Sequence, residues 1–233
     1  MKILAAVLFA LVAIIGAAVF WLSGNLDSLL KTAIGDYGSA MTQAKVSVDT
    51  VKIAAADGKG TISNLLIGNP AGFKTAHAIK VGQIDVDIDI ASVTRDVIII
   101  RRIAINAPDV IYEKGDSMTN FDAIQKHIAS YLGPADSKKE GKKLIVEELT
   151  IRDASAQASA AFMNGKTVNV PLPDITLKNL GKARGGISPG ELGQEIAGAL
   201  KARLSAAVSF DRLMKSTGEA LEKAGSAVKG LFK

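Results

Sequence analysis

The stretch Ala78-Ile79-Lys80-Val81-Gly82-Gln83-Ile84-Asp85-Val86-Asp87-Ile88-Asp89-Ile90 has the cleanest strand pattern in this 233-residue chain. Ile84, Val86, Ile88 and Ile90 alternate there with aspartates. Alternation with a period of two predicts a β-strand with one face against apolar material and one face in water. We therefore expect the chain to build a sheet with one apolar face.

Further strand patterns lie on both sides of this stretch. Residues 45–54 and 59–67 flank Asp57-Gly58, a strong turn signal, and predict a hairpin. Downstream, strands are expected at residues 97–105 and 110–113, and again at 144–153, 154–163 and 167–180. Because most links between them are short, a meandering antiparallel sheet is favoured over parallel units.

Helical spacing marks three other regions. The first is a short helix over residues 25–40, which Gly35 and Gly38 should end, and the second is residues 120–132, capped by Asn120 or Thr119. A charged linker at 133–143 separates it from the next strand. From Ser188 the chain is helical, and the apolar residues of its first stretch recur every fourth position: Leu192, Ile196, Leu200, Leu204 and Val208.

The N-terminal segment from Ile3 to Leu22 carries no charge. About 20 residues of helix span a bilayer core, and Trp21 suits the aromatic belt at a membrane interface. The alternative is a cleaved secretory signal, which has a shorter apolar run and small residues at its cleavage site. With Lys2 as the charge before the run, the positive-inside rule leaves the N-terminus cytoplasmic. The sequence thus predicts a single-pass inner-membrane protein with a periplasmic body.

The fold class expected from these patterns is α+β, mainly β. It has an N-terminal transmembrane helix, an antiparallel sheet and C-terminal amphipathic helices. Residues 1–24 form the anchor, residues 25–182 the β-rich domain and residues 183–233 the C-terminal helical region.

Composition excludes several function classes. The chain has no cysteine, so zinc sites and thiol chemistry that depend on cysteine are excluded. Its net charge is +5, but the basic residues are dispersed and only 5% of residues are aromatic, which is unlike a nucleic-acid-binding surface. No cofactor is expected. The modest positive charge favours attraction to anionic lipid headgroups.

No catalytic motif stands out. His77 and His127 lie far apart and have no acidic or cysteine partner at metal-ligand spacing. Residues 58–61, Gly-Lys-Gly-Thr, lack the following helix that a phosphate loop needs. No nucleophile elbow occurs, so an envelope hydrolase has almost no residue support.

The three aspartates of the quoted strand, Asp85, Asp87 and Asp89, have two readings. Carboxylates on one strand face could bind calcium, but the solvated outer face of a sheet explains them equally. Because like charges repel, we expect basic partners on the neighbouring strand, and Arg101 and Arg102 are the candidates.

Residues 1–125 resemble the AsmA-like family of membrane-anchored envelope proteins. The resemblance rests on an anchor, an amphipathic exit helix and a hairpin closed by Asp57-Gly58. It also rests on four further stretches: Gly60-Thr61-Ile62, Leu65 to Phe73 (Leu-Leu-Ile-Gly-Asn-Pro-Ala-Gly-Phe), Ala78 to Ile90, and Val97 to Ile103 with Pro108 to Glu113. The C-terminal half is similar only in general strand character.

The resemblance implies a long, curved, groove-like antiparallel sheet with an apolar concave face, and larger relatives are similar to bridge-like lipid-transfer proteins. About eight strands spaced about 4.8 Å apart give a groove of roughly 40 Å, too short to cross a periplasm unless protomers stack. Alternation selects the candidate groove residues: Ile84, Val86, Ile88, Ile90, Ile98 and Ile100. The loop with Asn69, Pro70, Gly72 and Phe73 is either a contact loop for a partner or a structural turn.

The leading functional hypothesis is a non-enzymatic protein that handles lipid, or maintains the outer membrane, through this apolar groove. The alternative is a structural or scaffold subunit that oligomerises or binds a larger membrane complex. The C-terminal helices could close the groove, lie on a membrane or pair with neighbouring protomers. Membrane lipid is therefore the expected partner, with a second copy or a membrane complex as the other candidates and nucleic acid excluded.

Overall fold

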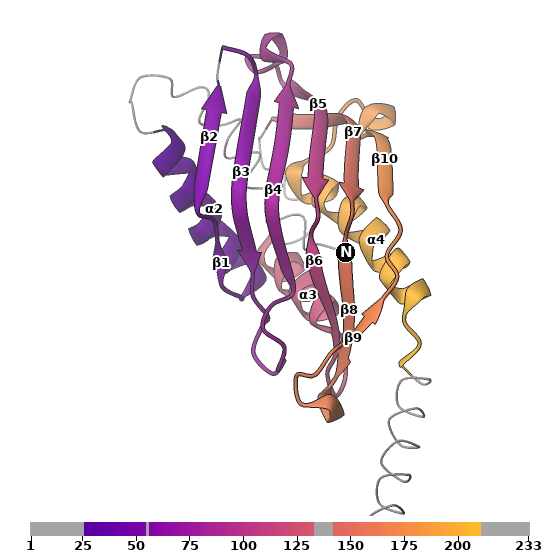
Figure 1. Ribbon diagram of the computed structural model, residues 1–233. Helices are drawn as coiled ribbons and strands as arrows, with labels where there is room; N and C mark the ends of the chain where they lie inside the picture. The colour runs from indigo at the N-terminus through magenta and orange to yellow at the C-terminus, as the bar shows by residue number, and fades with distance from the viewer. Residues whose placement is uncertain (1–25, 55, 133–141, 211–233) are drawn as a thin grey trace, which may run out of the picture.

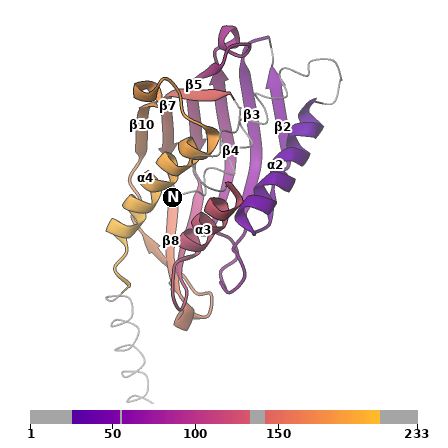
Figure 2. The ribbon, with the colours of Figure 1, turned by 180° about the vertical axis from the view of Figure 1, so that it is seen from behind.

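The computed structural model describes residues 26–54, 56–132 and 142–210. These residues form one bent β-sheet with helices packed on a single face (Figures 1 and 2). The helices are α2 (Leu26–Thr42), α3 (Asn120–Leu132) and α4 (Pro189–Ala207), with short 3-10 turns at η1 (Ile90–Ser92), η2 (Ala161–Met163) and η3 (Lys182–Arg184).

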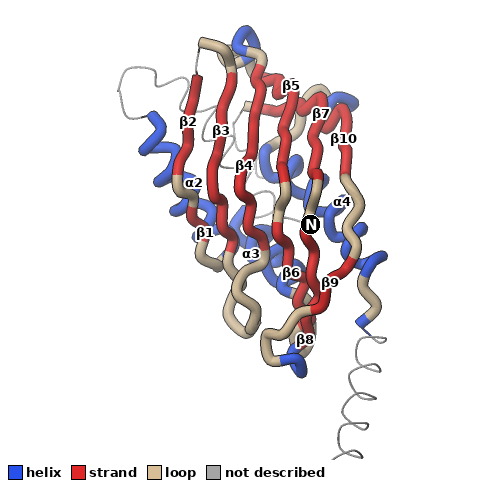
Figure 3. The backbone as a smooth tube through the Cα atoms, viewed as in Figure 1, coloured by secondary structure: helices blue, strands red, loops and turns tan. Residues whose placement is uncertain are grey.

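The strands are ten short segments of one sheet, which Figure 3 sets apart from the helices behind it. Their bounds are β1 (Val46–Ser47), β2 (Thr50–Ala54), β3 (Lys59–Ile67), β4 (Ile79–Ile88), β5 (Val97–Asn106), β6 (Asp109–Lys114), β7 (Lys143–Arg152), β8 (Ser155–Ala160), β9 (Val168–Val170) and β10 (Ile175–Leu180).

Register shows that most of these segments join into longer strands. β5 and β6 both pair with β4, so they continue one strand. β7 and β8 pair with β5 and β6 at the same difference in residue number, since Ile105 faces Ile151 and Asp109 faces Ser155. β7 and β8 are therefore also one strand. β1 and β2 share β3 in the same way, and β9 and β10 share β8 and β7. The described sheet is therefore six long strands whose spatial order follows the chain.

The predicted antiparallel meander is wrong at one place. β5 runs parallel to β7, and β6 runs parallel to β8, so the sheet is mixed. The connection between β6 and β7 contains α3, which lies on the helical face of the sheet (Figure 2), and β7 begins at the end of the sheet where β5 begins. A parallel neighbour needs such a crossover, whereas short turns supply antiparallel neighbours.

The sheet bends along a line of residues with left-handed backbone. Ser63, Gln83, Asn106 and Arg152 form one transverse row in register, and a positive-φ residue directly follows three of them. These residues are Asn64 (φ 52°), Ala107 (φ 46°) and Asp153 (φ 53°). Because a left-handed residue rotates the strand, the buried side shifts phase there: Ile62 and Leu65, three apart, are both buried.

A second phase shift crosses β5, β7 and β10. Each strand has two consecutive outward residues between buried ones, and these doublets are Arg101-Arg102, Glu147-Glu148 and Lys178-Asn179. The second shift therefore also lies in register across the strands, since Arg102 faces Glu148 and Glu148 faces Lys178.

The helices cover the apolar face because each has an apolar stripe. α2 buries Leu30, Ile34 and Met41, and α3 buries Phe121, Ile124 and Ile128. The predicted end of the first helix at Gly35 and Gly38 is wrong, because α2 continues to Thr42. Gly38 instead permits close packing, since a Cβ there would lie 2.8 Å from Val46 Cγ1.

The prediction of a single-pass inner-membrane protein is corrected. Within residues 26–54, 56–132 and 142–210, no helix is long and apolar enough to cross a membrane. The proposed anchor with Ile3, Trp21 and Leu22 lies outside the described residues, as does the predicted helix beyond residue 210. The first predicted C-terminal helix corresponds to α4, which packs on the sheet.

Ala107 offers a test of the bend. A left-handed conformation costs an L-residue about 1–2 kcal/mol, and a Gly there also loses more entropy on folding. We expect Ala107→Gly to raise the free energy of unfolding by about 0.5 kcal/mol, as urea denaturation would measure. Ala104→Gly, at a buried position of the same strand, should lower it instead. Loss of stability in both variants would contradict a strained Ala107.

Candidate functional site

The candidate groove residues lie on the helical face of the sheet and not in an open groove. Ile84, Val86, Ile88, Ile98 and Ile100 are all 8% exposed or less. They belong to one aliphatic cluster that includes the stripes of α2, α3 and α4. Ile90 is the exception, because it begins η1 and is 45% exposed. The open groove is therefore wrong for the described residues: the apolar face exists, but helices fill it.

α4 is the cover on the β7 and β10 side of the sheet (Figure 2). Its buried residues recur every fourth position, at Leu192, Ile196, Leu200 and Leu204, as the sequence predicted. Val208, the fifth predicted member, is the C-cap and is only partly buried.

A capping box defines the start of α4. The Glu191 backbone N–H donates to Ser188 Oγ, and the Ser188 backbone N–H donates to Glu191 Oε2 at 2.7 Å. The hydrogen bond from the Ser188 backbone lowers the pKa of the Glu191 carboxyl. Arg184 pairs with both Glu191 and Glu195, which ties the first turns to the preceding loop.

A tight turn links β10 to α4. Gly181, Gly185 and Gly186 all have positive φ, and a Cβ at Gly181 would lie 2.7 Å from the Leu144 carbonyl oxygen. Within α4, Gly193 and Gly198 occupy interior helical positions, where each Gly costs about 1 kcal/mol relative to Ala. α4 is therefore a weak helix by itself and depends on its packed stripe.

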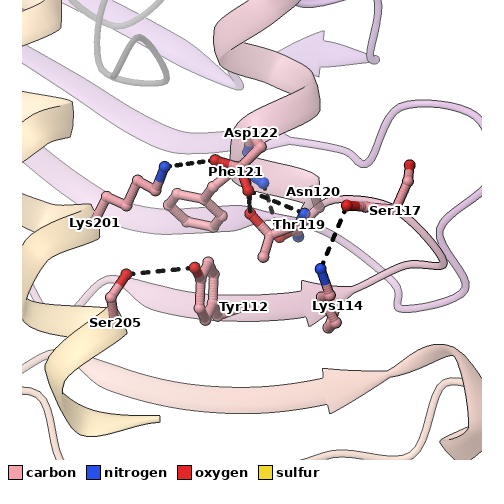
Figure 4. Close-up of polar contacts among 9 residues, drawn as sticks. All are labelled: Tyr112, Lys114, Ser117, Thr119, Asn120, Phe121, Asp122, Lys201 and Ser205. Atoms are coloured by element: carbon pink, nitrogen blue, oxygen red, sulfur yellow. Dashed lines mark hydrogen bonds and ion pairs between the residues drawn. The ribbon is translucent and has the colours of Figure 1, made fainter. Parts of the chain in front are cut away.

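The second half of α4 is clasped to α3 and β6 (Figure 4). Lys201 Nζ lies 2.5 Å from Asp122 Oδ1, and the Tyr112 and Ser205 hydroxyl oxygens are 3.4 Å apart. The Phe210 ring, beyond α4, packs against Tyr112 with centroids 5.4 Å apart. We call Asp122, Lys201, Tyr112 and Ser205 the clasp. The clasp was not predictable from the sequence, because Asp122 and Lys201 lie 79 residues apart and give no local signal.

Asp122 also bonds to Thr119, the residue that caps α3. The Thr119 hydroxyl and backbone N–H donate to Asp122 Oδ2, and the Asp122 backbone N–H donates to Thr119 Oγ1. Of the two caps that the sequence allowed, Thr119 is the one used. Burial raises the pKa of Asp122, but the hydrogen bonds from Lys201 and Thr119 outweigh it, so the pKa lies below its ordinary value of 3.8.

The loop with Asn69, Pro70, Gly72 and Phe73 is held by a buried carboxylate. Glu113 is 1% exposed, and it accepts hydrogen bonds from the Lys74 and Thr75 backbone N–H groups and from the Thr75 hydroxyl, at 2.6–2.9 Å. Asn69 Nδ2 donates to Thr75, and Asn120 Nδ2 donates to Asn69 Oδ1. Pro70 is buried, whereas Gly72 is exposed and Phe73 is half-buried. These hydrogen bonds support the interpretation of the segment as a structural turn.

The opposite face of the sheet carries a row of alternating charges, next to half-buried apolar residues such as Ile99 and Ile145. Across five strands, Lys59 faces Asp87, Asp87 faces Arg102, Arg102 faces Glu148 and Glu148 faces Lys178. Arg101 pairs with Asp89 at 2.9 Å and with Asp87 at 3.7 Å, which confirms the expected basic partner. A depression of 340 Å³ lies here, but its Lys59 and Arg102 are offset by Asp85 and Asp87.

The acidic residues and the two histidines form no metal site in the part of the chain that the structure describes. No group of three or more acidic or histidine residues is placed to hold a metal ion there. His77 Nε2 lies 3.1 Å from Asp109 Oδ2, and His127 Nδ1 lies 3.0 Å from the carbonyl oxygen of Thr42, the last residue of α2. Each histidine thus joins two elements.

Comparison of the chain with models of protein families, with curated proteins and with solved structures finds no match. The AsmA-like resemblance remains a prediction.

Glu113→Gln tests the buried loop support. The substitution turns one acceptor oxygen into an NH2 donor that meets N–H donors, and an unmet buried polar group costs about 1–3 kcal/mol. We expect the free energy of unfolding to fall by about 2 kcal/mol in urea denaturation. The matched control is Lys114→Gln at the adjacent, more exposed position, which should change it by less than about 0.5 kcal/mol. Equal effects would contradict the role of Glu113.

The clasp predicts a pH dependence. Because the folded pKa of Asp122 is lowered, its charge stabilises the fold at neutral pH, and this stabilisation is lost as the pH falls through that lowered value. Thermal unfolding from pH 7 downward should show wild type more stable than Asp122→Asn near neutrality, with the difference closing below about pH 4. In a double-mutant cycle with Lys201→Met, the coupling should vanish over the same range. A coupling that persists in acid would contradict an ion pair.

Proposed function

We propose that this chain is a non-enzymatic lipid-handling protein that captures acyl chains on the apolar face of its sheet, with α4 as a removable cover. The observation that carries the proposal is the contrast between α4 and the sheet surface that it covers. The sheet presents a continuous aliphatic surface, whereas the helix over its β7 and β10 side is glycine-containing and joins the sheet through a glycine turn.

The magnitudes of the two burials support an exchange of cover for ligand. Full burial of a Leu or Ile side chain contributes about 1.5–3 kcal/mol, so the four residues of the α4 stripe contribute about 6–12 kcal/mol. An acyl chain of about ten methylenes contributes about 8 kcal/mol at about 0.8 kcal/mol each. Burial of a ligand of that length would therefore offset most of the burial that the α4 stripe loses when α4 leaves the sheet.

The clasp is suited to holding such a cover reversibly. A partly exposed ion pair such as Asp122–Lys201 contributes only about 0.2–1 kcal/mol, so it orients α4 without preventing its release. The acyl chain would lie along Val146, Leu149 and Ile175, on the strands that α4 covers. Its headgroup would remain in water.

The alternative is a structural or scaffold protein in which α4 is a permanent part of the core. The specific observation that favours it is the low exposure of the candidate groove residues on β4 and β5. In this hypothesis the helices complete the fold, and partners bind the charged face or the edges of the sheet. The two readings differ in whether lipid ever enters.

Uptake kinetics test the proposal. We expect native mass spectrometry of the full chain to find phospholipid or fatty acid bound in stoichiometric amounts. We also expect Lys201→Ala to take up a fluorescent fatty acid up to about fivefold faster than wild type, because it releases the clasp. Arg203→Ala, at an exposed position of the same helix, is the matched control and should behave as wild type. Absence of bound lipid and of uptake would favour the scaffold.

A further inference from the structure

One end of the sheet gathers three loops into a single surface. The β3–β4 loop (68–78), the β6–α3 loop (115–118) and η2 with its following turn (161–166) lie together at the lower end of Figure 1. Lys74 Nζ donates to Asn164 Oδ1 at 2.8 Å and to the Ala161 carbonyl oxygen at 3.2 Å. A Cβ at Gly115 would lie 3.1 Å from the Phe73 ring. We call these three loops and Lys114 the basic tip.

The basic tip combines an exposed aromatic ring with positive charge. Phe162, in the middle of η2, is 45% exposed. The exposed or half-exposed charged residues of the tip are Lys74, Lys114, Lys166 and Asp116, a net positive set, because Glu113 just below them is buried among hydrogen-bond donors. These hydrogen bonds and the Lys74 contacts fix the loops to one another, so Phe162 projects from a braced surface.

We propose that the basic tip docks on an anionic lipid surface, with Phe162 inserted between headgroups and with Lys114 and Lys166 paired with lipid phosphates. A lysine near an anionic bilayer strengthens binding about fivefold, and a partly exposed aromatic ring suits the headgroup boundary. An acidic protein groove would also attract the lysines, but the exposed Phe162 ring among them favours the headgroup boundary of a bilayer.

The opposite end of the sheet provides an internal comparison. Ile90 is 45% exposed there, the same fraction as Phe162, and a Cβ at Gly58 would lie 3.0 Å from its Cγ1 atom. That end has mixed charge: Asp57, Asp89 and Asp96 lie among Lys59, Arg95 and Arg101, and Arg101 pairs with Asp89 at 2.9 Å. Equal apolar exposure in a surface of mixed charge makes position 90 a control for non-specific sticking of an exposed apolar residue.

The absence of cysteine from the chain makes a site-specific experiment direct. Phe162→Cys and Ile90→Cys, each in the full chain, are labelled with an environment-sensitive fluorophore. They are then titrated with vesicles of phosphatidylglycerol or of phosphatidylcholine. We expect a blue shift and quenching by brominated lipid at position 162 with phosphatidylglycerol, at least tenfold weaker binding to phosphatidylcholine, and no shift at position 90.

A second variant tests the charges. Lys114→Gln with Lys166→Gln, in the labelled Phe162→Cys chain, should weaken the position-162 response to phosphatidylglycerol by about 25-fold, at about fivefold per lysine. Lys74 is left unchanged because it braces the loops. No blue shift at position 162, an equal shift at position 90, or equal responses to both lipids would each overturn the proposal.

The docking proposal is separate from acyl-chain capture. The fluorophore reports only the environment of the tip, whereas fatty-acid uptake reports the interface below α4. Docking without fatty-acid uptake would support the docking proposal and contradict acyl-chain capture. Uptake without docking would support acyl-chain capture and contradict the docking proposal.

Discussion

The constraint on which this structure depends is that a bent sheet with one apolar face must bury that face. The bend arises from left-handed residues such as Asn64 and Ala107, which follow a single transverse row. Bending turns the aliphatic side chains of all the strands toward the same three helices. The outer face carries charges that alternate across β3, β4, β5, β7 and β10 and favour one register.

Local features were predictable from the sequence because their physics is local. The alternation around Ile84 located β4, Asp57-Gly58 located a hairpin turn, and the four-residue spacing after Ser188 located α4. Strand direction was not predictable in the same way, since the parallel pairing of β5 with β7 depends on the connection between β6 and β7, which contains α3. Closure of the candidate groove by a C-terminal helix was one of three alternatives that the sequence left open, because alternation identifies an apolar face but does not tell whether a helix or a ligand packs against it.

The candidate sites also divide into local contacts, which could be predicted, and long-range contacts, which could not. The pairing of Arg101 with Asp89 could be foreseen, because neighbouring strands bring such residues together. Asp122 and Lys201, or Glu113 and Thr75, come from distant parts of the chain, and only the fold joins them. The two proposals rest on such long-range juxtapositions: a weak helix clasped over an aliphatic sheet, and three loops fixed into one basic tip. Together they describe a molecule that would meet a lipid surface at one end and shelter an acyl chain beneath α4.

The central claim is that α4 is a removable cover and not a fixed part of the core. Hydrogen–deuterium exchange of the full chain tests it most directly, because exchange reports the opening free energy of each element. The account predicts that amides of Ala199 to Leu204 in α4 exchange through a partial opening, at least tenfold faster than buried amides of β4 and β5, and that fatty acid changes exchange in α4 selectively. Equal protection of α4 and these strands, with both exchanging only on global unfolding, would contradict the account.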